Sequence, residues 1–194
     1  MIQLILQHLK ELARFSGREA RKPFWIWAMT VIGGAFIAMT AIMTTVMSST
    51  FSKMEQFAAQ HPDQVTRTVG PTSYSITVHG NHPELIPDFG ALLLNVGVVS
   101  AIAILLLAAA VVRRLHDCNR TGAWGLPPAV LLVAGLVGMS RLFEQFDAPG
   151  GPPLGLFFGM FLTNLAYLGS LALLVVFLGD RGSLDENRFG PPPT

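Results

Sequence analysis

Charged residues are scarce in this chain, and their scarcity excludes most soluble folds. Asp, Glu, Lys and Arg make up 13% of the 194 residues, whereas soluble domains average about 25%. Apolar residues make up 51%, which leaves too few polar side chains to cover the surface of a soluble domain. Disorder is excluded as well, because disordered chains are poor in apolar residues and rich in charge. The composition therefore predicts an integral membrane protein.

The chain also lacks the residues that several kinds of site require. Its single cysteine, Cys118, cannot form an internal disulfide or build a cysteine-rich zinc site. The net charge of +1 gives no overall basic field for nucleic acid. No serine or cysteine stands in the motif of a nucleophile. We therefore predict no cofactor, no metal ion, no nucleic-acid partner and no catalytic residue, and a membrane enzyme is the least favoured function.

Four uncharged apolar stretches predict membrane spans, each of which takes about 20 residues. They cover residues 24–47, 90–112, 127–139 and 154–178. The third stretch is short, and we expect it to continue as an amphipathic helix as far as Phe146. The predicted fold class is an all-α integral membrane protein with four transmembrane helices, in a single domain over residues 1–194.

Lys and Arg lie mainly on one side of these spans. Ten of them fall in residues 1–22, in the loop after the second span and in the tail, residues 179–194, whereas three fall on the other side. Because positive residues collect on the cytoplasmic side of membrane proteins, this count predicts an N-in and C-in topology. Residues 48–89 then form an external loop, either hairpin-sized or partly disordered, in which residues 72–78 alternate like one β-strand.

The N-terminal segment has two faces. Apolar residues follow a helical spacing at Ile2, Ile5, Leu9 and Leu12, and polar residues lie between them. This pattern predicts an amphipathic helix over residues 2–14. The helix lies either in the membrane interface or against the protein's own cytoplasmic face.

Three polar segments combine arginine, glycine and aromatic residues next to membrane boundaries. They read FSGREARKPFW over residues 15–25, RRLHDCNRTGAW over residues 113–124 and NRFGP over residues 187–191. The predicted topology assigns all three to the cytoplasmic side, so their side chains are the first candidates for a functional site.

These segments resemble the DUF805 family of small bacterial inner-membrane proteins. The family pattern starts its first span with GRxSRxxFW, follows its second with RRLHDxGRSGWW and ends with NRFGPxP. This chain has GREARKPFW, RRLHDCNRTGAW and NRFGPPP in the same order. It departs from the pattern at Ala20, where a small hydroxyl residue is usual, at Asn119, where glycine is common, and at Ala123, where tryptophan is common. The resemblance implies a four-helix protein of the bacterial inner membrane and no assigned activity.

If the helix of the second span continues past residue 112, four polar side chains share one face: Arg113, His116, Asp117 and Arg120. We expect Asp117 to pair with Arg113 and Arg120. We expect Gly122 to cap the helix end. Two interpretations remain open for this end. Either it is solvated, with Arg114 reaching lipid phosphate, or Asp117 orients His116 in a site whose arginines hold an anion. Neighbouring helix residues point about 100° apart, so His116 and Asp117 do not form a ready catalytic pair.

Candidate binding residues come from all three segments. They are Arg18, Arg21, Arg113, Arg114, His116, Asp117, Arg120, Asn187 and Arg188. Because neighbouring helix ends in a bundle lie about 8–10 Å apart, we expect the segments to meet. An arginine of the first segment would lie beside the His116–Asp117 turn, with Asn187 or Arg188 nearby. The alternative is a solvated tail.

The favoured function is that of a non-enzymatic membrane module. Its cytoplasmic cluster would bind anionic lipid headgroups, a partner membrane protein or a second copy of the chain. The alternative is a small transporter or channel subunit. We favour it less, because transporters carry ionisable residues within their spans and these spans carry none.

Overall fold

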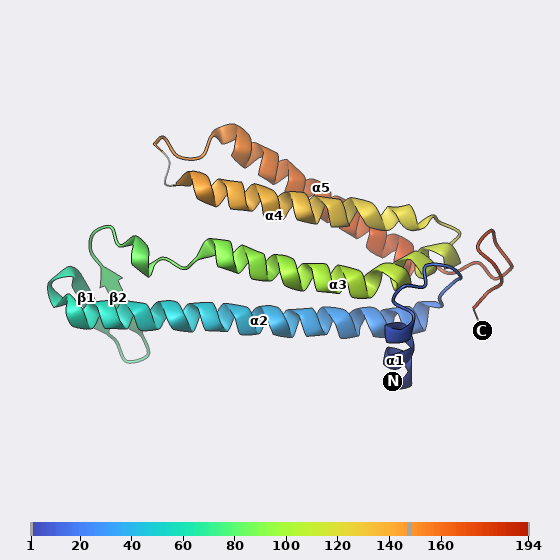
Figure 1. Cartoon of the computed structure of the whole chain (residues 1–194), viewed down its shortest axis with the longest axis horizontal. Coiled ribbons are helices and arrows are strands. Elements are labelled where there is room, and N and C mark those ends of the chain that lie inside the picture. The colour runs from blue at the N-terminus through green and yellow to red at the C-terminus, as the bar shows by residue number, and fades with distance from the viewer. Residues whose placement is uncertain (1, 147–148, 194) are drawn as a thin grey trace.

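The computed structural model describes residues 2–146 and 149–193. Its four long helices are α2 (Arg21–Gln60), α3 (Phe89–Asp117), α4 (Leu126–Phe146) and α5 (Leu154–Gly179). They run side by side in two antiparallel pairs, α2 with α3 and α4 with α5 (Figure 1). All four are long and apolar enough to cross a membrane, which confirms the predicted mostly helical fold with four helices that could span one.

One end of the bundle gathers the three polar segments. α2 and α4 begin there, α3 and α5 end there, and both ends of the chain lie there (Figure 1). We call it the motif end, and we call the opposite end the hairpin end. A short 3₁₀ turn, η3 (Gly122–Gly125), joins α3 to α4 at the motif end. α4 then continues to Phe146, as expected.

The hairpin end differs from the prediction. α2 continues to Gln60 and does not end at residue 47; in its last turns Ala58 is buried. Two strands, β1 (Val65–Val69) and β2 (Tyr74–Val78), form an antiparallel hairpin where one strand was predicted. The sequence did not reveal β1, since its residues are mostly exposed and give no apolar face. Two 3₁₀ turns, η1 (Pro62–Gln64) and η2 (Pro83–Leu85), flank the hairpin.

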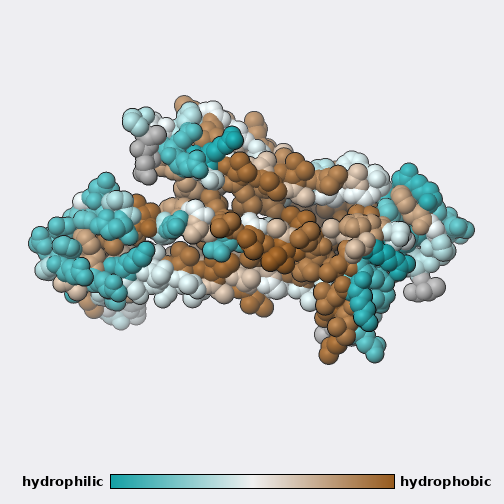
Figure 2. Space-filling model, viewed as in Figure 1, coloured by the Kyte–Doolittle hydropathy of each residue, from teal (hydrophilic) through white to brown (hydrophobic). Residues whose placement is uncertain are grey.

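The N-terminal helix α1 (Ile2–Lys10) is shorter than predicted, and residues 11–13 form a turn. It crosses the start of α2 at a steep angle (Figure 1). Apolar atoms cover the side of α1 that faces the hairpin end, and polar atoms cover the opposite side (Figure 2).

The buried core lies at the motif end and not midway along the spans. Its members are Phe24, Trp27, Ala28, Val31, Ala110, Leu115, Leu174 and Leu178. Along the middle of the bundle large apolar side chains stay exposed, such as Phe36 on α2 and Leu105 on α3, and an apolar belt follows the bundle (Figure 2). The tightest packing of the protein therefore supports the end that carries the polar segments.

Candidate functional site

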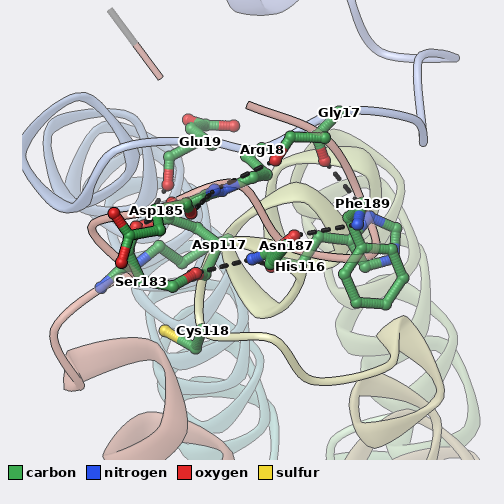
Figure 3. Close-up of polar contacts among 12 residues, drawn as sticks. Gly17, Arg18, Glu19, His116, Asp117, Cys118, Ser183, Asp185, Asn187 and Phe189 are labelled. Atoms are coloured by element: carbon green, nitrogen blue, oxygen red, sulfur yellow. Dashed lines mark hydrogen bonds and ion pairs between the residues drawn. The ribbon is translucent and has the colours of Figure 1, made fainter. Parts of the chain in front are cut away.

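The three polar segments meet at the motif end. The segment before α2 crosses the end of α3, and the tail after α5 folds back over both (Figure 3). Arg18 binds Asp117, with Nε 3.0 Å and Nη2 2.9 Å from the same carboxylate oxygen. Asn187 of the tail donates to the backbone carbonyl oxygen of His116 at 3.0 Å. The predicted meeting of the segments is therefore confirmed.

Asp117 lies at the centre of this cluster. Its side chain is 5% exposed and accepts hydrogen bonds from two guanidinium groups, those of Arg18 and Arg114. The side chain of Arg114 is fully buried, so the prediction that it reaches lipid phosphate is wrong. It also donates to three backbone carbonyl oxygens: those of Glu19, Leu178 and Asp180. Carbonyl groups at a helix C-terminus lack helical partners and attract cations, so Arg114 ties α3 to the end of α5.

The pairing within α3 also differs from the prediction. Asp117 pairs with Arg18 and Arg114, and not with Arg113 and Arg120. The prediction compared only neighbours on one helix. In the structure other segments cover the last turn of α3: Arg113 pairs with Glu19 of the first polar segment, whereas Arg114 pairs with Asp117 within the helix.

Glu19 joins Arg113 to the N-terminal helix. One carboxylate oxygen accepts from Nε and Nη2 of Arg113 at 3.0 and 2.8 Å, and the other lies 2.5 Å from Nε2 of His8. Arg113 also donates to the carbonyl oxygens of Glu11 and Arg14. Neither Glu19 nor His8 is among the predicted site residues. Glu19 had a signal, because it is the only acid in the first polar segment.

Arg18 holds the tail. Its side chain is 1% exposed, and it donates to three carbonyl oxygens of the tail: those of Ser183, Asp185 and Gly190. Together with the bond from Nε to Asp117, these contacts give all three guanidinium nitrogens an acceptor. Arg18 therefore connects the tail to the end of α3.

The tail forms a tight turn over the end of α3. Asn187 and Gly190 exchange two backbone hydrogen bonds, and the Asn187 side chain accepts from the backbone N–H of Phe189. Phe189 stacks on His116 with the ring centroids 3.8 Å apart and the planes 6° apart. Nδ1 of His116 donates to the carbonyl oxygen of Gly17 at 3.2 Å. The alternative of a solvated tail is therefore wrong.

Left-handed backbone conformations occur in each of the three segments. Gly17 and Gly190 adopt φ values of 90° and 118°, and Asn119 adopts 53°. Asparagine tolerates this region better than most residues, because its short side chain bonds locally. This tolerance explains why Asn119 can occupy the position at which the pattern RRLHDxGRSGWW has glycine.

The prediction that Gly122 caps α3 is wrong. The helix ends at Asp117, and Cys118 is its cap residue. Gly122 instead begins η3, where a Cβ atom would come within 2.8 Å of the Val112 side chain.

Burial raises the pKa of the Cys118 thiol above its ordinary value, so this cysteine is a weak nucleophile.

Other basic side chains of the motif end are more exposed. Arg21 and Lys22 form the first turn of α2, which has no acidic residue and no side-chain cap. Arg188 donates to the carbonyl oxygen of Asn119 at 3.2 Å. Arg120 pairs with Asp180 at 3.0 Å and lies over the ring of Phe177. The six predicted arginines thus divide into three with buried side chains, Arg18, Arg113 and Arg114, and three that are more exposed, Arg21, Arg120 and Arg188.

Two hollows open at the motif end. The larger has a volume of about 780 Å³ and lies between α1, the first polar segment and the prolines of the tail. The smaller has a volume of about 360 Å³, and Arg21, Arg181 and Ser183 are among its lining residues. Within residues 2–146 and 149–193, no three His, Cys, Asp or Glu side chains meet closely enough to share a metal ion.

The family comparison covers nearly the whole chain. A family model described as "Protein of unknown function (DUF805)" matches residues 12–191. Neither the curated proteins nor the solved structures include a match to the chain. The matched range contains all three polar segments.

Proposed function

The chain belongs to the DUF805 family, and we propose that it is a non-enzymatic membrane module that binds anionic lipid headgroups at its motif end. One observation carries the proposal. The buried arginines Arg18, Arg113 and Arg114 are held by internal acceptors, whereas other basic side chains of the same end are exposed. In this proposal the buried arginines stabilise the site, and the exposed basic side chains bind lipid.

The start of α2 supports this assignment. Arg21 and Lys22 lie in its first turn, where no acid balances them. A helix N-terminus carries a partial positive charge of its own, so two cations there raise the local positive potential further. Arg181 lines the same 360 Å³ hollow as Arg21. A phosphate group between these side chains would relieve the repulsion, and guanidinium groups bind phosphate through paired hydrogen bonds.

We infer that the motif end faces the cytoplasm of a bacterial inner membrane. Ten of the thirteen Lys and Arg residues belong to the segments at this end, and the positive-inside rule then favours this orientation. The cytoplasmic leaflet carries anionic lipids, so the same orientation brings the exposed cations to their proposed ligand.

The N-terminal helix supports a location at the lipid surface. On α1 the side chains of Ile2, Leu6 and Leu9 are exposed, and apolar atoms cover one side of the helix (Figure 2). A helix with separate polar and apolar sides lies in the interface plane of a bilayer. We propose that α1 inserts these side chains into the membrane next to the basic residues.

Native mass spectrometry tests the proposal. The protein is extracted from vesicles of equal parts phosphatidylglycerol and phosphatidylcholine, and the retained lipids are counted. The triple variant Arg21→Gln, Lys22→Gln and Arg181→Gln should lose most of its preference for phosphatidylglycerol, because each cation near the surface contributes about 1 kcal/mol. The matched control replaces the three basic residues of the hairpin end, Lys53, Arg67 and Arg141, with Gln.

The control should retain phosphatidylglycerol as the unchanged protein does. An equal loss in both triple variants, or no loss in either, would contradict a lipid site at the motif end.

A further inference from the structure

His8 occupies a closed position between three parts of the fold. It is buried on α1, and its ring stacks on Trp27 of α2, with centroids 5.1 Å apart and planes 17° apart. Its Nδ1 lies 2.9 Å from the carbonyl oxygen of Leu4. Its Nε2 lies 2.5 Å from a carboxylate oxygen of Glu19. Both ring nitrogens therefore face an oxygen atom.

These contacts determine how many protons the pair holds. A carbonyl oxygen only accepts, so Nδ1 must carry the hydrogen that points to Leu4. In a neutral imidazole the other nitrogen is then a bare acceptor, which would oppose an ionised carboxylate. The 2.5 Å contact between His8 and Glu19 requires one more proton. The requirement holds whether that proton rests on the ring or on the carboxyl group.

Other charged side chains surround the pair. The second carboxylate oxygen of Glu19 accepts from Arg113 of α3, and Arg113 lies 3.8 Å from the Glu11 carboxylate that follows α1. Glu11 itself pairs with Arg14 at 3.1 Å, and Trp27 contributes no charge. Loss of the shared proton would leave a bare ring nitrogen against the Glu19 carboxylate, at a site where both side chains are at most 8% exposed.

We propose that His8 and Glu19 form a proton-binding site that fastens α1 to the bundle. The other contacts of this segment are Leu4 and Ile5, which are partly buried against the core, and the bonds from Arg113 to the carbonyl oxygens of Glu11 and Arg14 just after α1. The outer side of α1 is exposed. The docked helix binds one proton that the released helix does not need, so docking weakens as the pH rises. The inference concerns the attachment of α1 and does not depend on lipid binding.

Spin labelling of the full chain tests the proposal. A nitroxide is attached at Gln3→Cys in a Cys118→Ser background, and the protein is placed in phosphatidylcholine nanodiscs, which contain no anionic lipid. Its spectrum is recorded between about pH 5 and about pH 9, a range that includes ordinary histidine titration. We expect a mobile component that grows as the pH rises and disappears when the pH is lowered again. A spectrum that stays unchanged across the range would overturn the proposal.

Two variants identify the groups responsible. In Glu19→Gln the amide can donate to neutral His8, so the growth of the mobile component at high pH should be absent. In His8→Gln the ring that shares the proton is gone, so the spectrum should be independent of pH. The same alkaline rise in both variants would assign the effect to another group and overturn the proposal.

Trp27 emission supplies a second readout that reports on the ring itself. In the variant Trp25→Phe with Trp124→Phe, Trp27 is the only tryptophan, and it stacks on His8. We expect its emission to change over the same pH range as the nitroxide spectrum, and this change should be absent in His8→Gln. A change that persists without His8 would contradict the proposed site.

Discussion

At the motif end charged side chains are buried and paired, whereas at the hairpin end Lys53, Arg67 and Arg141 all lie exposed. A charge can be buried only where another charge or several hydrogen bonds replace its water. The motif end meets this condition, because Asp117 and Glu19 each accept from arginine side chains. The difference therefore lies in the packing of three segments against one helix end.

The comparison also separates two kinds of stability. The hairpin end is a two-stranded sheet on the last turns of α2, and such hairpins are only marginally stable alone. The motif end joins α1, α3, α5 and the tail through side chains that leave few donors free. Substitutions at the motif end should therefore destabilise the protein far more than matched substitutions at the hairpin end.

The largest effect is expected at Asp117. Asp117→Asn removes the charge that Arg18 and Arg114 share, and leaving buried cations without their anion costs about 3–5 kcal/mol. The free energy of unfolding in mixed micelles measures the effect. The control, Asp63→Asn, changes an exposed acid at the hairpin end and should stay within about 0.5 kcal/mol of the unchanged protein. Equal effects at the two sites would remove the distinction between the ends.

A smaller effect is expected from an added methyl group. In Gly182→Ala the new Cβ would overlap the Asp117 carboxylate, and crowding of this kind costs about 1–3 kcal/mol. Gly155 at the hairpin end has no neighbour near that position, so Gly155→Ala should be neutral or stabilising by up to about 1 kcal/mol. Thermal unfolding in detergent ranks the two variants. A melting temperature for Gly182→Ala at or above that of Gly155→Ala would contradict the close approach of the tail.

The smallest effect concerns backbone conformation. Asn119→Ala places a less tolerant residue in the left-handed region and should cost about 1–2 kcal/mol, whereas Asn119→Gly should be nearly neutral. Asn81, exposed at the hairpin end, does not adopt a positive φ, so Asn81→Ala should leave the melting temperature unchanged. Equal melting temperatures for Asn119→Ala and Asn119→Gly would show that the left-handed backbone does not restrict which residue can occupy position 119.

Much of this architecture could be predicted from the sequence. The spans follow from uncharged apolar runs, and the meeting of the polar segments follows from their common side. Individual pairs could not be predicted, because the choice of Arg18 and not Arg120 as the partner of Asp117 depends on the path of the tail. His8 gave no signal of its own, since a lone histidine on an amphipathic helix has many ordinary roles. The strand β1 and the long end of α2 depend on mutual packing that no local pattern reveals.

A double-mutant cycle between Arg18 and Asp117 tests most directly whether one buried ionic cluster unites the polar segments. The free energies of unfolding of Arg18→Met, Asp117→Asn and the double variant are compared with that of the unchanged protein. Residues that share a buried pair couple by about 0.5–3 kcal/mol, and we predict a value in the upper half of that range. Additivity within about 0.3 kcal/mol would mean that the two side chains act independently, and it would contradict the cluster.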